Sequence, residues 1–277
     1  MQLGIRLHDL APGTLNERLG FAREQGFTCG HLALAKVIKE NSVRDAALTP
    51  GYAMHLKRLF AEYSIDVAVL GCYLNLADPR QEKMKEIQKR YMTNIRFASW
   101  LGCGVVGTET GAPNEAYRFE PACRSQEALK TLIDNLRPVV AYAEKMGVVM
   151  AIEPVYKHIV YNPRRARQVL DAIDSPNLQI ILDPVNLLGP DNWQQQDEII
   201  TEALELLRDD IAVIHIKDFI PEDDELKAVA AGEGRMNYTQ ILQFIRQEKP
   251  YIPVTLENTC PANAVKAADH IRQLLLH

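Results

Sequence analysis

Short apolar runs of strand length alternate along this chain with longer segments in which apolar residues recur at helical spacing. This alternation predicts eight strands, each followed by a helix. The expected strands cover residues 2–7, 28–34, 66–72, 104–110, 148–152, 178–182, 211–214 and 253–256. The clearest helical segments cover residues 51–63, 81–101, 125–146, 193–208, 238–248 and 264–275. Two further helices are expected to begin near Thr14, a good N-cap residue, and near Pro163, which suits a first helical position.

Two connecting segments are long and lack a clear period. Residues 35–50 are polar and irregular, and we expect a long loop there with a short helix. Residues 221–236 are also polar and carry Gly232-Glu233-Gly234, so we expect a second loop.

Strict alternation of strands and helices predicts a parallel sheet. Eight such units in 277 residues favour a closed (β/α)₈ TIM barrel over an open sheet. The composition does not change along the chain, so residues 1–277 are expected to form a single domain. No GxGxxG follows the first strand, and the main sign of a dinucleotide-binding fold is therefore absent.

Composition removes several classes of function. The chain is 47% hydrophobic and 24% charged, with a net charge of −5 and no cluster of Lys and Arg. We therefore expect no nucleic-acid partner and no membrane partner. The five cysteines form no CxxC pair, and the first ten residues have a strand pattern rather than a signal-peptide layout. These features favour reduced thiols and a cytoplasmic location.

The last four expected strands share a chemical feature. Each ends in a residue that can bind a metal ion, and these residues are Glu153, Asp183, His215 and Glu257. Because the carboxyl ends of parallel barrel strands meet at one face, we expect these side chains to surround one point. Singly, each carboxylate could instead cap a helix, and His215 could be a hydrogen-bonded core residue. Together they suit one divalent cation such as Mn²⁺, Mg²⁺, Co²⁺ or Zn²⁺.

The order Glu, Asp, His, Glu on strands five to eight resembles the sugar phosphate isomerase/epimerase superfamily, which has the xylose isomerase-like TIM barrel and includes the AP endonuclease family 2. The matching segments are Ile152-Glu153-Pro154, Leu182-Asp183-Pro184-Val185-Asn186, Ile214-His215-Ile216-Lys217-Asp218, Gly232-Glu233-Gly234 and Leu256-Glu257-Asn258. This resemblance implies that Glu153, Asp183, His215 and Glu257 bind one divalent ion, most often Mn²⁺. It also implies a carbohydrate substrate, Glu153 and Glu257 as catalytic bases, and a possible homo-oligomer.

The chain departs from two subgroups of this superfamily. Ketohexose 3-epimerases have a glutamate, a histidine and an arginine at the positions of Ile159, Asn186 and Pro221, which weakens the expectation of a free ketohexose substrate. The endonuclease IV branch needs a trinuclear zinc cluster, and Asn186 replaces one of its histidine ligands. DNA repair is therefore not expected.

Five further polar residues are candidates for contacts with substrate. They lie at or beyond strand ends and are Glu109, His158, Asn186, Lys217 and Asp218. Glu109 could instead be a structural cap, and His158 could lie in a solvated loop. Asp218 could alternatively orient the ring of His215, because histidines that bind metals usually have such an acceptor.

Three functions fit these residues. The first is a metal-dependent isomerase or epimerase that removes the proton α to a carbonyl of a sugar, keto-sugar or inosose and passes through an enediolate. The second is a lyase or dehydratase that uses the same site and then eliminates a group, with His158 or Lys217 as a general acid. The third is a sugar-binding barrel without catalysis.

Overall fold

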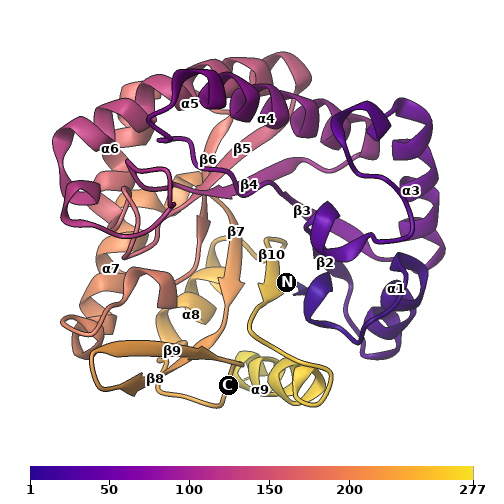
Figure 1. Ribbon diagram of the computed structural model, residues 1–277. Helices are drawn as coiled ribbons and strands as arrows, with labels where there is room; N and C mark the ends of the chain where they lie inside the picture. The colour runs from indigo at the N-terminus through magenta and orange to yellow at the C-terminus, as the bar shows by residue number, and fades with distance from the viewer. Residues whose placement is uncertain (277) are drawn as a thin grey trace.

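A computed structural model describes residues 1–276 of the chain. Among these residues, eight parallel strands close into a barrel in the order β1-β10-β7-β6-β5-β4-β3-β2, and helices surround them (Figure 1). The barrel strands are β1 (Gln2–Arg6), β2 (Cys29–Leu32), β3 (Asp66–Gly71), β4 (Val105–Glu109), β5 (Val149–Glu153), β6 (Leu178–Leu182), β7 (Ile211–Ile216) and β10 (Pro253–Leu256). The predicted TIM barrel is therefore confirmed.

Local sequence explains where the helices begin and end. They are α1 (Leu15–Glu24), α2 (Leu34–Val37), α3 (Pro50–Glu62), α4 (Gln81–Leu101), α5 (Gln126–Met146), α6 (Pro163–Ile173), α7 (Gln196–Leu207), α8 (Thr239–Gln247) and α9 (Ala264–Leu276). Thr14 forms a capping box with Glu17 at the start of α1. Asn162 caps α6, whose first residue is Pro163. Gly147 ends α5 in the left-handed conformation that glycine adopts without strain. No helix in the described part of the chain has the length and apolar character that crossing a membrane requires.

Two apolar layers hold the barrel together. The larger one fills the space between the strands and the surrounding helices. A smaller cluster contains residues such as Val69, Ala151, Ile181 and Val213 from the strands themselves. A β-carbon on Gly107 would lie 2.6 Å from Ile181 and 2.8 Å from Val69, so glycine is required for this packing.

The prediction of a loop at residues 221–236 was only partly right. A two-stranded antiparallel hairpin forms there from β8 (Asp218–Glu222) and β9 (Glu225–Val229), outside the barrel. Pro221 and the acidic residues of this segment hid the strands, because exposed ribbons bury little apolar surface and show a weak period. The predicted short helix within residues 35–50 corresponds to a 3₁₀ turn at Asp45–Ala47, preceded by α2.

The Asp218 carboxylate anchors this hairpin. Its Oδ1 accepts hydrogen bonds from the backbone N–H groups of Phe219 (2.8 Å) and Met236 (2.7 Å). Its Oδ2 accepts a third from Gly232 at 3.0 Å. A buried carboxylate that receives three backbone donors fixes the segment that follows β9 against the barrel.

Gly4 is expected to be intolerant of a side chain. A β-carbon there would lie 2.3 Å from the backbone oxygen of Cys29 on the paired strand, so Gly4→Ala must push β1 and β2 apart. We expect a loss of about 1–3 kcal/mol in the free energy of unfolding, measured by chemical denaturation. Gly104→Ala is the matched control, because its β-carbon would have no atom within 4 Å. Equal stability of the two variants would contradict this packing.

Replacing Asp218 with asparagine should loosen the hairpin. The amide group presents N–H donors where the backbone also donates, so we expect a cost of about 1–3 kcal/mol. Hydrogen exchange should become faster within residues 218–236, while the exposed turn variant Asp224→Asn should leave it unchanged. Unaltered exchange in Asp218→Asn would show that the carboxylate does not hold this segment.

Candidate metal centre and substrate cavity

Four side chains from successive barrel strands meet at the carboxyl end of the barrel. Glu153 is the last residue of β5, Asp183 follows β6, His215 lies in β7, and Glu257 follows β10. All four are buried, and each offers a ligand atom such that all these atoms lie within 4.8 Å of one another. The structure therefore brings together the whole set that the strand ends predict.

The strand register explains this convergence. His215 on β7 pairs with Thr255 on β10, and the N–H of Glu257 donates to the carbonyl of Ile216 at 2.9 Å. Glu153 pairs with Glu109 on β4. Because neighbouring strands are parallel and nearly in step, residues at their carboxyl ends are held side by side by backbone hydrogen bonds.

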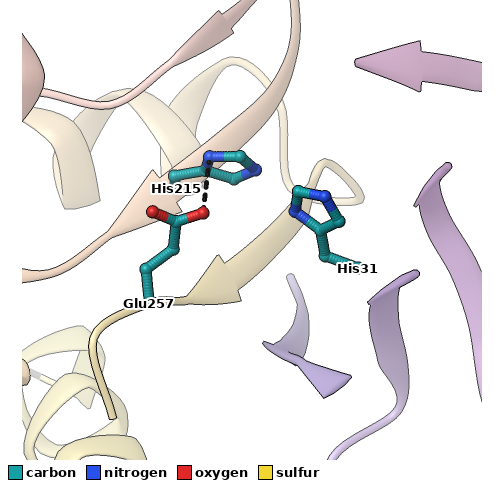
Figure 2. Close-up of side chains that lie close together, drawn as sticks. All are labelled: His31, His215 and Glu257. Atoms are coloured by element: carbon teal, nitrogen blue, oxygen red, sulfur yellow. Dashed lines mark ion pairs between the residues drawn. The ribbon is translucent and has the colours of Figure 1, made fainter. Parts of the chain in front are cut away.

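The imidazole of His215 lies between two carboxylates. Its Nδ1 is 3.3 Å from Glu153 Oε1 and 3.2 Å from Glu257 Oε1, and Figure 2 shows the contact with Glu257. Burial disfavours the charged ring, but Glu257 and Glu153 outweigh this effect and raise the pKa of His215 to about 9. The carboxylates thus create a strong demand for positive charge at this point.

Lys217 supplies positive charge to the same cluster. Its Nζ lies 2.8 Å from Asp183 Oδ2, 3.6 Å from Glu257 Oε2 and 2.7 Å from Asn186 Oδ1. Although burial favours the neutral amine, Asp183, Glu257 and Glu153 raise the pKa of Lys217 above its usual value. The ammonium group therefore stays charged beside the carboxylates.

Glu257 also faces Arg6, the last residue of the neighbouring strand β1. Arg6 Nη1 lies 3.5 Å from Glu257 Oε2, and its Nε lies 3.0 Å from Asp9. Burial alone would raise the pKa of Glu257, but His215, Lys217 and Arg6 together lower it below the usual value. For Asp183, burial dominates and raises the pKa despite the nearby Lys217.

These residues fit one divalent cation. His215 presents its Nδ1 to the carboxylates of Glu153 and Glu257, and one potential ligand atom from each of the four side chains lies within 4.8 Å of the others. Three carboxylates, the Lys217 ammonium and one dication carry zero formal charge together when His215 is neutral. Three oxygen-donor residues and one imidazole form a set that suits Mn²⁺, Mg²⁺, Co²⁺ or Zn²⁺.

A polar cavity of about 320 Å³ opens directly onto the cluster. Glu109, Asn186 and Lys217, three of the five residues expected to contact substrate, line it. Glu109 accepts a hydrogen bond from Tyr117 Oη at 3.2 Å, and burial raises the pKa of its carboxyl group. The remaining lining residues are Arg6, His8, Lys36, Tyr73, Tyr117, Glu153, Glu257 and Asn258.

The other two candidates lie elsewhere. His158 lines a neighbouring cavity, with its Nδ1 3.7 Å from Glu109 Oε2, and burial lowers its pKa to about 4. Asp218 lies outside the lining of the polar cavity, and the backbone N–H groups of the hairpin segment occupy both of its carboxylate oxygens. Its position supports neither the predicted contact with substrate nor the alternative role of orienting His215; it anchors the hairpin instead.

Sequence reasoning missed His31, which Figure 2 shows beside His215. The two rings stack with centroids 5.3 Å apart, and His31 Nε2 lies 3.0 Å from Tyr73 Oη. Burial, followed by the influence of His215, lowers the pKa of His31 well below its usual value. The expected strand at residues 28–34 placed His31 in its middle, whereas β2 ends at Leu32. With the end of β2 placed at Leu32, a search for potential metal ligands at the carboxyl ends of the strands would have identified His31.

A larger hollow of about 430 Å³ lies on the outer surface between α8 and α9. Its lining includes Tyr238, Leu242, Arg246, His270 and Leu274, and it contains none of the four ligand candidates. The smaller polar cavity is therefore the better candidate for a functional site.

Known structures share this architecture. A D-tagatose 3-epimerase-like protein is 20% identical and has a TM-score of 0.78, with 100% of this chain and 97% of that chain covered. The probable 3-DHS dehydratase AsbF of Bacillus anthracis is 16% identical with a TM-score of 0.75, covering 99% and 98%. The IolI protein with a bound zinc atom is 17% identical with a TM-score of 0.75, also covering 99% and 98%. At these identities the likeness establishes the fold.

Sequence comparison agrees with the structure. An uncharacterized protein of Methanocaldococcus jannaschii is 24% identical over 233 residues, which span 82% of this chain and 76% of that protein. The family model described as xylose isomerase-like TIM barrel matches residues 19–274, nearly the whole chain. This protein therefore belongs to the xylose isomerase-like TIM barrel family.

Proposed function

We propose that this protein is a divalent-metal-dependent isomerase or epimerase of a sugar, keto-sugar or inosose. One observation carries the proposal: four buried potential ligands from successive strands converge at one point, and two of them, Glu153 and Glu257, line a polar cavity. The epimerase-like protein with the same fold supports this assignment.

The metal would be held by Glu153, Asp183, His215 and Glu257. Mn²⁺ is our first expectation, and Mg²⁺, Co²⁺ and Zn²⁺ suit the same ligands. When bound, the ion supplies a Lewis acid that polarises the substrate carbonyl and makes the adjacent C–H bond more acidic.

Glu153 and Glu257 are the proposed bases. The contacts of Glu153 with Asn186 and His215 are both on Oε1, so its Oε2 can accept the proton from carbon. In Glu257, Oε1 faces His215, and Oε2 has only the longer contacts of 3.5 Å to Arg6 and 3.6 Å to Lys217, so Oε2 is the oxygen proposed to accept the proton. The Nδ2 of Asn186 donates to Glu153 Oε1 at 2.8 Å and fixes that side chain. His215, Lys217 and Arg6 keep Glu257 deprotonated. In epimerisation, one glutamate removes the proton and the other returns a proton to the opposite face of the same carbon.

The rest of the cavity suits a polyhydroxylated molecule. Glu109 accepts hydrogen bonds, Lys217 donates them, and Tyr117 Oη and Asn186 can do both. Lys217 is buried and the other three are half-buried, so a substrate with matching hydroxyls would gain hydrogen bonds that a substrate lacking them could not make, which gives the site selectivity.

A lyase or dehydratase is the second candidate. It would begin with the same proton removal and continue with loss of a group at the β-carbon. Lys217 is the better placed proton donor, because it lines both the polar cavity and its neighbour. His158 is less suited, because its pKa of about 4 leaves it neutral near pH 7. The structurally similar probable dehydratase supports this candidate.

A sugar-binding barrel without catalysis is the third candidate. It would be preferred if protein purified without chelator held no divalent ion and Glu153→Gln left sugar binding unchanged. A carbohydrate partner, a cytoplasmic location and a possible homo-oligomer stay expectations from the sequence.

Metal content provides a direct prediction. Protein purified without chelator should contain one divalent ion per chain by elemental mass spectrometry. Asp183→Asn should lower metal affinity by more than about tenfold, because even changes beyond the direct ligands cost about 10–100-fold. Glu109→Gln is the matched control, since Glu109 lines the cavity outside the ligand set and should leave metal content unchanged. Equal loss in both variants would contradict the assigned ligands.

Exchange of substrate protons tests the chemistry. Metal-loaded protein, incubated in D₂O with a panel of ketohexoses, inososes and keto-glycosides, should introduce deuterium α to the carbonyl of its substrate, as seen by NMR. Isomerisation conserves mass apart from deuterium, whereas elimination releases a second molecule. Glu153→Gln and Glu257→Gln should slow exchange by about 10²–10⁴-fold at saturating metal, because each lacks a base.

Glu205→Gln serves as the control, because Glu205 is exposed on α7. If Glu153→Gln and Glu257→Gln both bind metal and still exchange deuterium at the wild-type rate, the proposed roles of Glu153 and Glu257 are contradicted.

A further inference from the structure

A second cavity of about 250 Å³ lies beside the polar one at the mouth of the barrel. It is bounded by the segments that follow β5, β6 and β7 and by strand β9 of the hairpin. Six of its twelve lining residues have apolar side chains, and these are Val155, Val185, Leu188, Pro190, Leu226 and Ala228. The others are Gly189 and the polar residues Tyr156, Lys157, His158, Asn186 and Lys217. A cavity with a large apolar wall next to a polar centre suits an amphiphilic occupant.

Asn186 and Lys217 belong to both cavities. Lys217 Nζ and Asn186 Oδ1 lie 2.7 Å apart, and Lys217 also contacts the Asp183 carboxylate at 2.8 Å. The second cavity thus begins one side chain away from the proposed ligands. The pair forms a wall shared by the two cavities, and a molecule that occupies both must pass beside it.

The walls of the second cavity are tied together. Tyr156 N–H donates to the carbonyl of Asn186 at 2.7 Å, which joins the segments that follow β5 and β6. The exposed Lys157 pairs with Glu225 of β9 at 2.9 Å, and Asp218 anchors the other end of the hairpin. A cavity whose walls are already fixed loses little conformational entropy when it is filled.

We propose that the second cavity is a subsite for an apolar substituent, such as an aryl aglycone, attached to the sugar at the metal centre. The identity of that sugar rests on the proposed function, whereas the apolar subsite rests on the cavity itself. A glycoside or other substituted keto-sugar is therefore the substrate class. This class agrees with the departures from the ketohexose 3-epimerases. Ile159 is buried in the core and Pro221 lies in the hairpin, so neither position offers the charged side chain that those epimerases have there.

Two glycosides provide the probes: 4-fluorophenyl β-D-glucopyranoside and methyl β-D-glucopyranoside. Their binding to zinc-loaded protein is measured by isothermal titration calorimetry. We expect the aryl glycoside to bind about tenfold or more tightly, because its ring buries apolar surface that the methyl group lacks.

Ala228→Trp fills the cavity and should remove this preference, and Leu226→Asp should weaken it by placing a charge in the apolar lining. Lys227→Trp is the matched control, since Lys227 is exposed on the same strand and does not line the cavity. All three variants should keep the wild-type metal content, and the two tryptophan variants should also keep the wild-type melting temperature.

Three results would overturn the subsite: no detectable binding of the aryl glycoside, equal affinity for both glycosides, or an unchanged preference in Ala228→Trp that melts as wild type. A preference lost equally in Lys227→Trp would also count against it. If the preference holds but no keto-sugar exchanges deuterium, the subsite stands and the proposed function fails. If exchange occurs without any aryl preference, the function stands and the subsite fails.

Discussion

The structure depends on holding three carboxylates together at the buried end of a barrel. Glu153, Asp183 and Glu257 repel one another, and their removal from water makes each negative charge costly. Lys217 and a protonated His215 offset part of this cost, and Arg6 adds a third positive group at the rim. A dication suits such a cluster, because it would replace the proton on His215 and would bring four potential ligands to one positive charge.

The barrel makes this cluster possible without local strain at the ligands. Backbone hydrogen bonds between parallel strands fix the position of each strand end, so the ligands need no long loops to reach one another. The variable parts of the molecule lie beyond this frame. The segments after β5 and β6 and the β8–β9 hairpin shape the space above the metal centre, and Asp218 fastens the hairpin to the barrel. In the proposed function, the four converging residues supply the chemistry and these added walls select the substrate.

The sequence was sufficient for the fold and for the residues that converge. Apolar strands of regular spacing predict a buried parallel sheet, and strand ends in such a barrel point to one face, which is why Glu153 and His215 could be placed together. His31 was missed because a shift of two residues in the predicted end of β2 moved it away from that face. The hairpin was missed because its stability comes from pairing and from Asp218, and neither leaves a hydrophobic period. Asp218 was predicted as a site residue because it follows His215 closely in the sequence. Proximity in sequence does not reveal which way its side chain points.

A crystal structure of manganese-loaded protein, with anomalous scattering recorded near the manganese edge, tests the central claim most directly. The account predicts a single strong anomalous peak at bonding distance from Glu153, Asp183, His215 and Glu257, with its open side toward the polar cavity. Loaded crystals with no peak there, or with the ion bound elsewhere and these four side chains still arranged around Lys217, would contradict it.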